Sequence, residues 1–524
     1  MRTLVIGLDG YEISLAERLM EMGKLPNMKK LCATSARYLL DHGRAKYSGL
    51  AWEHVCTGKS PEAMGRYSAV DFDSRTYRVK QRPTNAVPIL RGFTSTQTVI
   101  FDMPYCDLRL APNVQGLTSW GAHDPGVEPL SNPPSLHDEL MKYFGEYPAE
   151  RYIYGFVWPN PEETTKAGIA LRSAVRKRTE CAKWLLNDRL PNWNLAFVVV
   201  SEAHSGIEML WHGIDPQHLL HKHPSARPAR VGLISIYREI DTLIGTLVAA
   251  FPDAQVLVFS MHGMGTNNSD IAGMTLLPEL LHRHRFARPY MDTGKWQTAD
   301  RQVKVSQDFS WHFGLESAIP PLWEFKPVAG IDTTRFTYDR QRDYQVIEWM
   351  PTARYQPFWP LMDIFAVPAF YDGRMRVNLA GREAEGRVKL SEYASVIDDT
   401  INLLAECRDL STGEPVLNET FLVECDPLKL DPSQADLEVT WRGTPTGFVH
   451  PKLGEIGPVP CRRPGGHSGA WGFAWCSGSR WLAGDYGVRS AFDVMPTIAE
   501  MSGQRAESLL CSGRPFHSPS HDVA

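Results

Sequence analysis

The chain has 524 residues and a net charge of −5 at pH 7, with 43% hydrophobic and 22% charged residues. These values are ordinary for a globular protein with a large core, and the length favours more than one domain. The isoelectric point is about 6.4 and no long basic run appears, which argues against nucleic acid as the main partner.

The cysteines and the N-terminal sequence bear on the compartment. The nine cysteines contain no CxxC pair, and such an odd number in a long chain predicts free thiols in a reducing compartment. The apolar run in MRTLVIGLDG is too short for a signal peptide and passes directly into Asp9. No run approaches the ~20 apolar residues of a membrane span. We therefore expect a soluble cytoplasmic protein without a membrane partner.

Short apolar runs alternate with helical stretches along the first half of the chain. In chain order, the predicted strands are 3–8, 98–101, 195–201 and 255–260, and the predicted helices are 13–22, 26–32, 164–186 and 231–250. Continuously apolar strands are typical of sheets that are covered on both faces. The alternation predicts an α/β fold, a three-layer α/β/α sandwich around a mostly parallel sheet.

The alternating pattern loosens after about residue 285. Residues 285–460 are rich in Pro, Trp and Arg and contain a predicted helix at 392–407, and we interpret them as an inserted cap subdomain. Residues 1–284 would form the first part of the α/β core. Residues 461–524 would return to this core through a strand at 472–476 and a helix at 493–501.

Residues of the kind that bind metals follow the predicted strands, in the order Asp9, Glu202, His204, Glu208, His262 and, in a late glycine-rich turn, His467. Polar sites gather at the carboxyl ends of strands in such sheets, so we expect these side chains to meet. Four residues separate His204 from Glu208, which places both on one helix face at a spacing that suits a metal ion. A helix cap for Asp9 and a structural role for each lone histidine are the alternatives.

Ser48 stands ahead of a short predicted helix in KYSGLAWEHVCTGKSP, and that helix ends at Thr57. A serine hydroxyl is a weak nucleophile, and coordination to a metal ion would activate it by lowering its pKa. Backbone N–H groups at the helix N-terminus would face an anionic ester. The alternative role of Ser48 is that of the helix N-cap, for which serine is a preferred residue.

This ordered set resembles the alkaline phosphatase superfamily, and most closely its type I phosphodiesterase/nucleotide pyrophosphatase branch. The segments GKLPNMKKL, VNLAGREAEGRV and FDVMPTIAEMSG extend the likeness over almost the whole chain. Members of this branch use two metal ions, usually zinc, in an α/β core. The resemblance therefore implies a metal-dependent hydrolase of phosphate esters with Ser48 as nucleophile. It implies one or two zinc ions, with manganese or iron as alternatives, and a small anionic ester as substrate.

The resemblance assigns two metal-ligand sets, namely Asp9, Ser48 and His262 for one ion, and His204, Glu208 and His467 for the other. Three positions depart from the family. Met261 stands where the family has a ligand Asp, and a thioether replaces a carboxylate poorly, so the first set is short by one ligand. His204 and Glu208 stand where the family has Asp and His, and they still suit a zinc-like ion.

Weaker candidates for contacts with the ligands or the substrate are Glu202, Asp124, Arg376, Asn378 and Arg382. Asp124 lies beside His123 in WGAHDP, which either lines a pocket or forms an ordinary turn. The arginine fork suits phosphate, but a structural ion pair explains each arginine equally well. For the histidine-rich tract at 212–223, a solvated loop is favoured over a metal site.

Other functions remain open at this level. Phosphoryl or sulfuryl transfer and sulfate ester hydrolysis occur in the same superfamily. The stretch from Ser48 to Trp52 lacks the Pro and Arg of formylglycine sulfatases, which argues against that mechanism. A degenerate binding protein is the third alternative, and Met261 is its main support.

Overall fold

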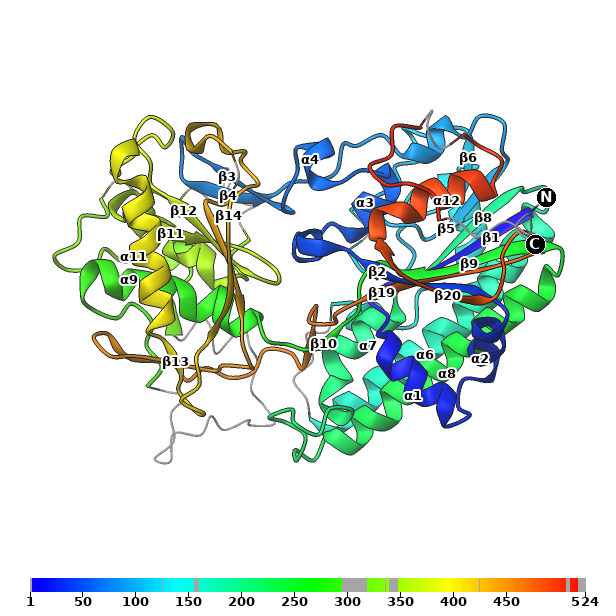
Figure 1. Cartoon of the computed structure of the whole chain (residues 1–524). Coiled ribbons are helices and arrows are strands. Elements are labelled where there is room, and N and C mark those ends of the chain that lie inside the picture. Colours follow the sequence, from blue (N-terminus) through cyan, green and yellow to red (C-terminus); the bar gives the residue numbers. More distant parts are fainter. Residues whose placement is uncertain are drawn as a thin grey trace.

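The computed structural model describes residues 2–124, 126–154, 160–294, 318–334, 336–338, 347–423, 425–505 and 509–516. Figure 1 shows these residues as two lobes, a larger one around a nine-stranded sheet and a smaller one around a four-stranded sheet. The predicted α/β fold with a large central sheet is confirmed.

The strands of the large sheet lie in the order β20-β2-β19-β9-β1-β8-β5-β6-β7. Their bounds are β1 Arg2–Leu8, β2 Ala36–Asp41, β5 Thr98–Phe101, β6 Val114–Leu117, β7 Ser131–Asn132, β8 Leu195–Val200, β9 Ala254–Ser260, β19 Gly472–Ser477 and β20 Gly484–Ser490. Five neighbouring pairs are parallel, whereas β19 runs antiparallel to both β9 and β2, and β7 to β6. The four predicted strands correspond to β1, β5, β8 and β9.

Helices cover both faces of this sheet (Figure 1). One layer contains α1 Ile13–Glu21, α2 Pro26–Ala33, α5 Leu136–Phe144, α6 Pro161–Lys183, α7 Glu202–Leu210 and α8 Ala226–Ala250; the other contains α3 Ala51–Thr57 and α12 Val494–Met501. The short helix α4 Pro61–Met64 lies between α3 and the smaller lobe (Figure 1). Alternate residues of β1 enter different cores, because Leu4 and Ile6 pack with the first layer and Val5 packs with the second. Among the described helices, none combines the length and apolarity that crossing a bilayer needs.

The smaller lobe has a core of its own. Its sheet has the order β11-β12-β15-β14, with bounds β11 Ile364–Val367, β12 Gly373–Val377, β14 Leu417–Leu422 and β15 Leu437–Trp441. Around it lie α9 Leu277–Phe286, α11 Tyr393–Ala405, the hairpin β3 Val70–Asp73 with β4 Arg78–Gln81, and the short strands β13 Arg408–Asp409, β16 Phe448–His450 and β17 Gly454–Ile456. The apolar cluster of this lobe takes residues from 70–79 and from 271–459. The predicted domain boundaries at 285 and 460 stay predictions.

A two-residue ladder carries the C-terminal part of the chain back to the large sheet. β10 Gly265–Thr266, which follows β9, pairs antiparallel with β18 Gly465–Gly466. Since His262 precedes β10 and His467 follows β18, this pairing brings both histidines to the carboxyl edge of the sheet.

Candidate metal centre

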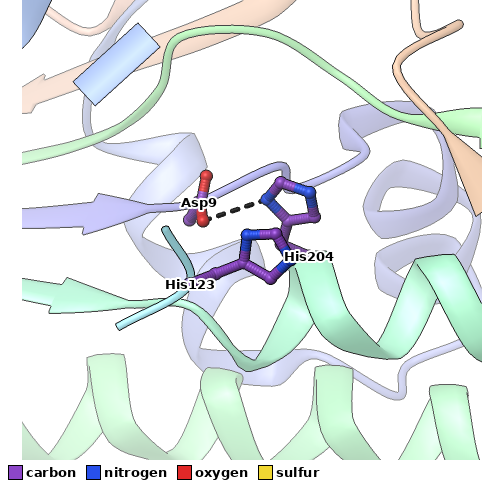
Figure 2. Close-up of side chains that lie close together, drawn as sticks. All are labelled: Asp9, His123 and His204. Atoms are coloured by element: carbon purple, nitrogen blue, oxygen red, sulfur yellow. Dashed lines mark hydrogen bonds and ion pairs between the residues drawn. The ribbon is translucent and has the colours of Figure 1, made fainter. Parts of the chain in front are cut away.

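Three buried donors converge where β1, β6 and β8 end (Figure 2). Asp9 directly follows β1, His204 lies in the first turn of α7 after β8, and His123 belongs to the loop after β6. His204 Nδ1 lies 3.0 Å from Asp9 Oδ2, and the rings of His123 and His204 stack with centroids 3.8 Å apart. One ligand atom from each residue lies within 4.8 Å of the others. His123 Nε2 is buried without a hydrogen-bond partner, and this donor set fits a zinc-like ion.

The environment holds Asp9 and His204 in the protonation states that metal binding needs. Burial raises the pKa of Asp9, but His204, His123 and a hydrogen bond from Trp52 outweigh burial, so the pKa lies below its ordinary value. Burial and His123 lower the pKa of His204. At neutral pH the carboxyl group is therefore ionised and the imidazole is neutral, as ligands must be.

His262 and His467 lie next to this cluster. His467 Nε2 is 3.2 Å from His204 Nε2, and the rings of His467 and His262 are 4.3 Å apart. Burial lowers the pKa of His262 to about 4, so this ring is neutral at pH 7. Tyr371, in the loop between β11 and β12, stacks on His467 at 3.5 Å and closes the site from the smaller lobe. No sequence pattern had pointed to Tyr371.

Glu208 already has a cationic partner. It lies one helical turn after His204, with its Oε1 3.5 Å from His204 Nε2, and is fully buried. Arg463 Nη1 donates to the same Oε1, and Arg463 Nε donates to Asp270 Oδ2 at 2.8 Å. Burial lowers the pKa of Arg463 to about 10, which leaves the guanidinium charged at neutral pH.

Ser48 lies two residues ahead of the N-cap of α3. The N-cap is Leu50, so the interpretation of Ser48 as a helix cap is wrong. Ser48 Oγ donates to Ala45 O at 2.7 Å and accepts from the backbone N–H of Leu50 at 3.1 Å. The segment reaches the centre through Trp52, which hydrogen-bonds Asp9.

Glu202 belongs to a buried ionic cluster and not to a solvated strand end. Arg178 Nε donates to Glu202 Oε1 at 2.9 Å, and Arg178 Nη1 donates to Asp102 Oδ2 at 2.7 Å. All three side chains have no exposed surface. Asp102 accepts from the backbone N–H groups of Trp120 and Gly121, so the cluster holds the loop that carries His123.

Asp124 lines a cavity beside the centre. Its Oδ2 lies 3.3 Å from His123 Nδ1. The cavity has a volume of about 420 Å³, and Tyr105, Tyr154 and Arg109 contribute to its walls. A larger cavity of about 790 Å³ lies beneath the β3–β4 hairpin and shares no residue with the histidine cluster, so we do not connect it with the chemistry.

The three candidates from the predicted cap are engaged inside the smaller lobe. Arg376 donates to Glu383 and to backbone carbonyl groups, and Arg382 pairs with Glu383 and Asp436. The Asn378 side chain bonds the Tyr77 hydroxyl group and three backbone carbonyl groups. These contacts favour the structural alternative for all three.

Burial accounts for Met261 and for two histidines of the tract at 212–223. Met261 is 5% exposed and packs in the apolar cluster between the sheet and α12, where a carboxylate would lack solvation. In the histidine-rich tract, His212 and His218 are buried, and His212 Nε2 lies 2.9 Å from Ser225 Oγ. The interpretation of this tract as a solvated loop is therefore wrong for these two residues.

Comparison with known families decides the wider assignment. The family model for type I phosphodiesterase / nucleotide pyrophosphatase matches residues 3–308, which is more than half of the 524 residues. The chain belongs to this family. As a type I phosphodiesterase it is a hydrolase of phosphate esters, and the family is metal-dependent, which accords with the three convergent donors.

Solved structures similar to this phosphodiesterase are distant in sequence. Phosphonoacetate hydrolase from Sinorhizobium meliloti 1021, in complex with phosphonoformate, is 11% identical over 96% of both chains with a TM-score of 0.49. Murine ectonucleotide pyrophosphatase / phosphodiesterase 5 is 10% identical over 97% of this chain and 96% of its own, with a TM-score of 0.44. No curated protein matches the chain. The assignment rests on the family model.

Proposed function

We propose that this chain hydrolyses a small anionic phosphate ester with the help of a metal ion held by Asp9, His123 and His204. The observation that carries the proposal is the convergence of these three buried donors within 4.8 Å in a member of a metal-dependent family. Imidazole nitrogens with one carboxylate oxygen suit zinc, and they also accept manganese or iron.

We assign the attack on phosphorus to Ser48. Its Oγ forms the bond to phosphorus while the bond to the ester oxygen breaks; the serine proton passes to water, and the leaving oxygen takes a proton from water. A second water molecule then cleaves the phosphoserine and restores the hydroxyl group. A bound metal ion would supply positive charge that lowers the pKa of the hydroxyl group and offsets charge on the phosphoryl oxygens. The hydrogen bond between Trp52 and Asp9 supports this role for Ser48, because it ties the segment that carries the serine to the metal centre.

The cavity of about 420 Å³ beside His123 supports a substrate with an organic group on phosphorus. Tyr105 and Tyr154 would contact the apolar part of such a group. Phosphodiesters therefore come first among the candidate substrates, and phosphomonoesters second.

Metal-dependent turnover of model esters tests the proposal. The metal-stripped protein is assayed with bis(4-nitrophenyl) phosphate, 4-nitrophenyl phosphate and 4-nitrophenyl sulfate, with and without added Zn²⁺. We expect zinc-dependent diester hydrolysis that falls at least about 100-fold in Asp9→Asn and His123→Ala. His284→Ala, on the exposed face of α9, is the matched control and should retain the rate. A rate that does not respond to metal refutes the proposal, and turnover of the sulfate alone supports the sulfuryl alternative.

We propose that the protein resides in the reducing cytoplasm, because its cysteines are free thiols. All nine cysteines are free thiols, and five of them are buried. Such thiols persist where disulfides do not form. Titration of the freshly extracted, unfolded protein with a thiol reagent should find nine reactive groups, and fewer would contradict the proposal.

A further inference from the structure

A buried guanidinium group stands where the family resemblance places the second metal ion. The predicted second ligand set is His204, Glu208 and His467. Arg463 donates to Glu208 Oε1, the oxygen that faces His204, and only 6% of the Arg463 side chain is exposed. Glu208 itself has no exposed surface, so solvent does not compete for this oxygen. A permanent cation therefore takes the place of a metal ion on Oε1, whereas Glu208 Oε2 lies 3.5 Å from His123 Nε2.

The two ligand sets also compete for one imidazole ring. His204 Nδ1 faces Asp9 Oδ2 at 3.0 Å, whereas His204 Nε2 faces His467 Nε2 at 3.2 Å and Glu208 Oε1 at 3.5 Å. A neutral imidazole has one nitrogen with a free lone pair, and its other nitrogen carries a proton. His204 can therefore ligate one ion, either beside Asp9 and His123 or beside Glu208 and His467.

The charges around Glu208 favour the set that contains Asp9. Two carboxylates, Glu208 and Asp270, are matched by two guanidinium groups, because Arg462 and Arg463 both donate to Asp270. Glu208 thus contributes no net negative charge that would attract a divalent ion. A divalent ion bound to Glu208 would instead lie beside the guanidinium group of Arg463, in a buried site where two positive charges are poorly screened from each other.

The backbone brings Arg463 to this position through a close approach. β18 pairs with β10, and the α7 backbone lies so near Gly465 that a Cβ there would collide with the carbonyl oxygen of Ile207. The segment that ends in His467 therefore lies directly against the helix that carries Glu208. The placement of Arg463 follows from this packing and from its pair with Asp270.

We propose that the enzyme holds a single metal ion, in the set Asp9, His123 and His204, and that the guanidinium group of Arg463 replaces the second ion by engaging Glu208 Oε1, the oxygen that faces His204. The inference rests on the proposed function, since it concerns the ion of the same site. Arg463 acts through Glu208 and is a positioning residue.

Calorimetric titration of the metal-stripped protein with Zn²⁺ tests the proposal without an activity assay. We expect one equivalent per chain. Asp9→Asn and His123→Ala should weaken binding at least about tenfold, whereas Glu208→Gln should change it less than about threefold. In the Arg463→Met background Glu208 is released, so Glu208→Gln should now weaken zinc binding about tenfold or more. Arg462→Met is the matched control, because Arg462 pairs with Asp270. In this background Glu208→Gln should leave the zinc affinity unchanged within about threefold.

Three results would overturn the inference: two equivalents of zinc in the wild type, a tenfold effect of Glu208→Gln in the wild type, or no effect of Glu208→Gln in the Arg463→Met background. If circular dichroism shows that Arg463→Met does not fold, the zinc stoichiometry of the wild type and the effect of Glu208→Gln in the wild type still test the inference. The absence of any zinc binding would refute the proposed function itself, and two equivalents would leave that function standing while removing the single-ion inference.

Discussion

Replacing Arg178 by Met should cost a large share of the stability of the α/β lobe. Arg178 holds Asp102 and Glu202 at 2.7 and 2.9 Å and donates to the carbonyl oxygens of Val199 and Gly121 at 3.0 and 3.1 Å. The variant leaves two carboxylates unpaired in a place without exposed surface, and breaking a buried pair in this way costs about 3–5 kcal/mol. Whole domains are stable by only about 5–15 kcal/mol.

The measurement is urea unfolding followed by circular dichroism, with Arg176→Met as the control. Arg176 pairs with Glu239 at the surface of the same helix, and such exposed pairs contribute about 0–1 kcal/mol. Burial already raises the pKa of Glu202, and loss of Arg178 should raise it further. A carboxyl group whose pKa is raised in the folded state destabilises the fold at pH values above that pKa, where the group must be ionised. The variant should therefore lose less free energy of unfolding, relative to the wild type, near pH 5 than near pH 8. An Arg178→Met protein within about 1 kcal/mol of the wild type at pH 8 would refute this reasoning.

Three further outcomes are expected. Ser48→Ala should lose at least about 100-fold in turnover but only about 1–2 kcal/mol of stability, measured by initial rates and urea unfolding; retained turnover would mean that water attacks directly. Met261→Asp should lower the melting temperature of the metal-free protein, since it puts a carboxylate into an apolar cluster, and an unchanged value would contradict that placement. Burial lowers the pKa of His212 to about 3, so the folded protein keeps this imidazole neutral while the unfolded chain takes up a proton below about pH 6.5. The free energy of unfolding therefore falls as the pH falls below 6.5. Acidification from pH 7 to about 5 should cost about 2 kcal/mol through this residue, and His212→Gln should remove that loss in urea titrations at both pH values.

The sequence predicted the parts of the fold that local pattern determines. The four continuously apolar runs became β1, β5, β8 and β9, and Asp9, His204 and His262 follow three of them as expected. Polar residues at the carboxyl ends of neighbouring parallel strands must lie close together, so these residues could be grouped without coordinates.

The rest of the site depends on contacts that no local pattern encodes. His123 follows β6, which is short and contains Gln115 and Gly116, so the sequence did not indicate a strand there. Its Trp/Gly-rich loop was the only signal. Arg463 meets Glu208 across 255 positions in sequence, and two adjacent arginines could equally have faced solvent. The apolar surroundings that explain Met261 come from several distant elements.

The position of β19 and β20 affects the order in which the polypeptide can fold during synthesis. In the described part of the chain, β2 pairs with β19 and β20 alone, and β19 is also the strand that joins β2 to β9. Residues 36–41 must therefore wait for partners that leave the ribosome more than 400 residues later. At about 5–20 residues per second, the wait is roughly 20–90 s. During that time β2 and the free edge of β9 are exposed for wrong pairing, so a chain truncated before β19 should be a substrate for chaperones and proteases instead of a smaller enzyme.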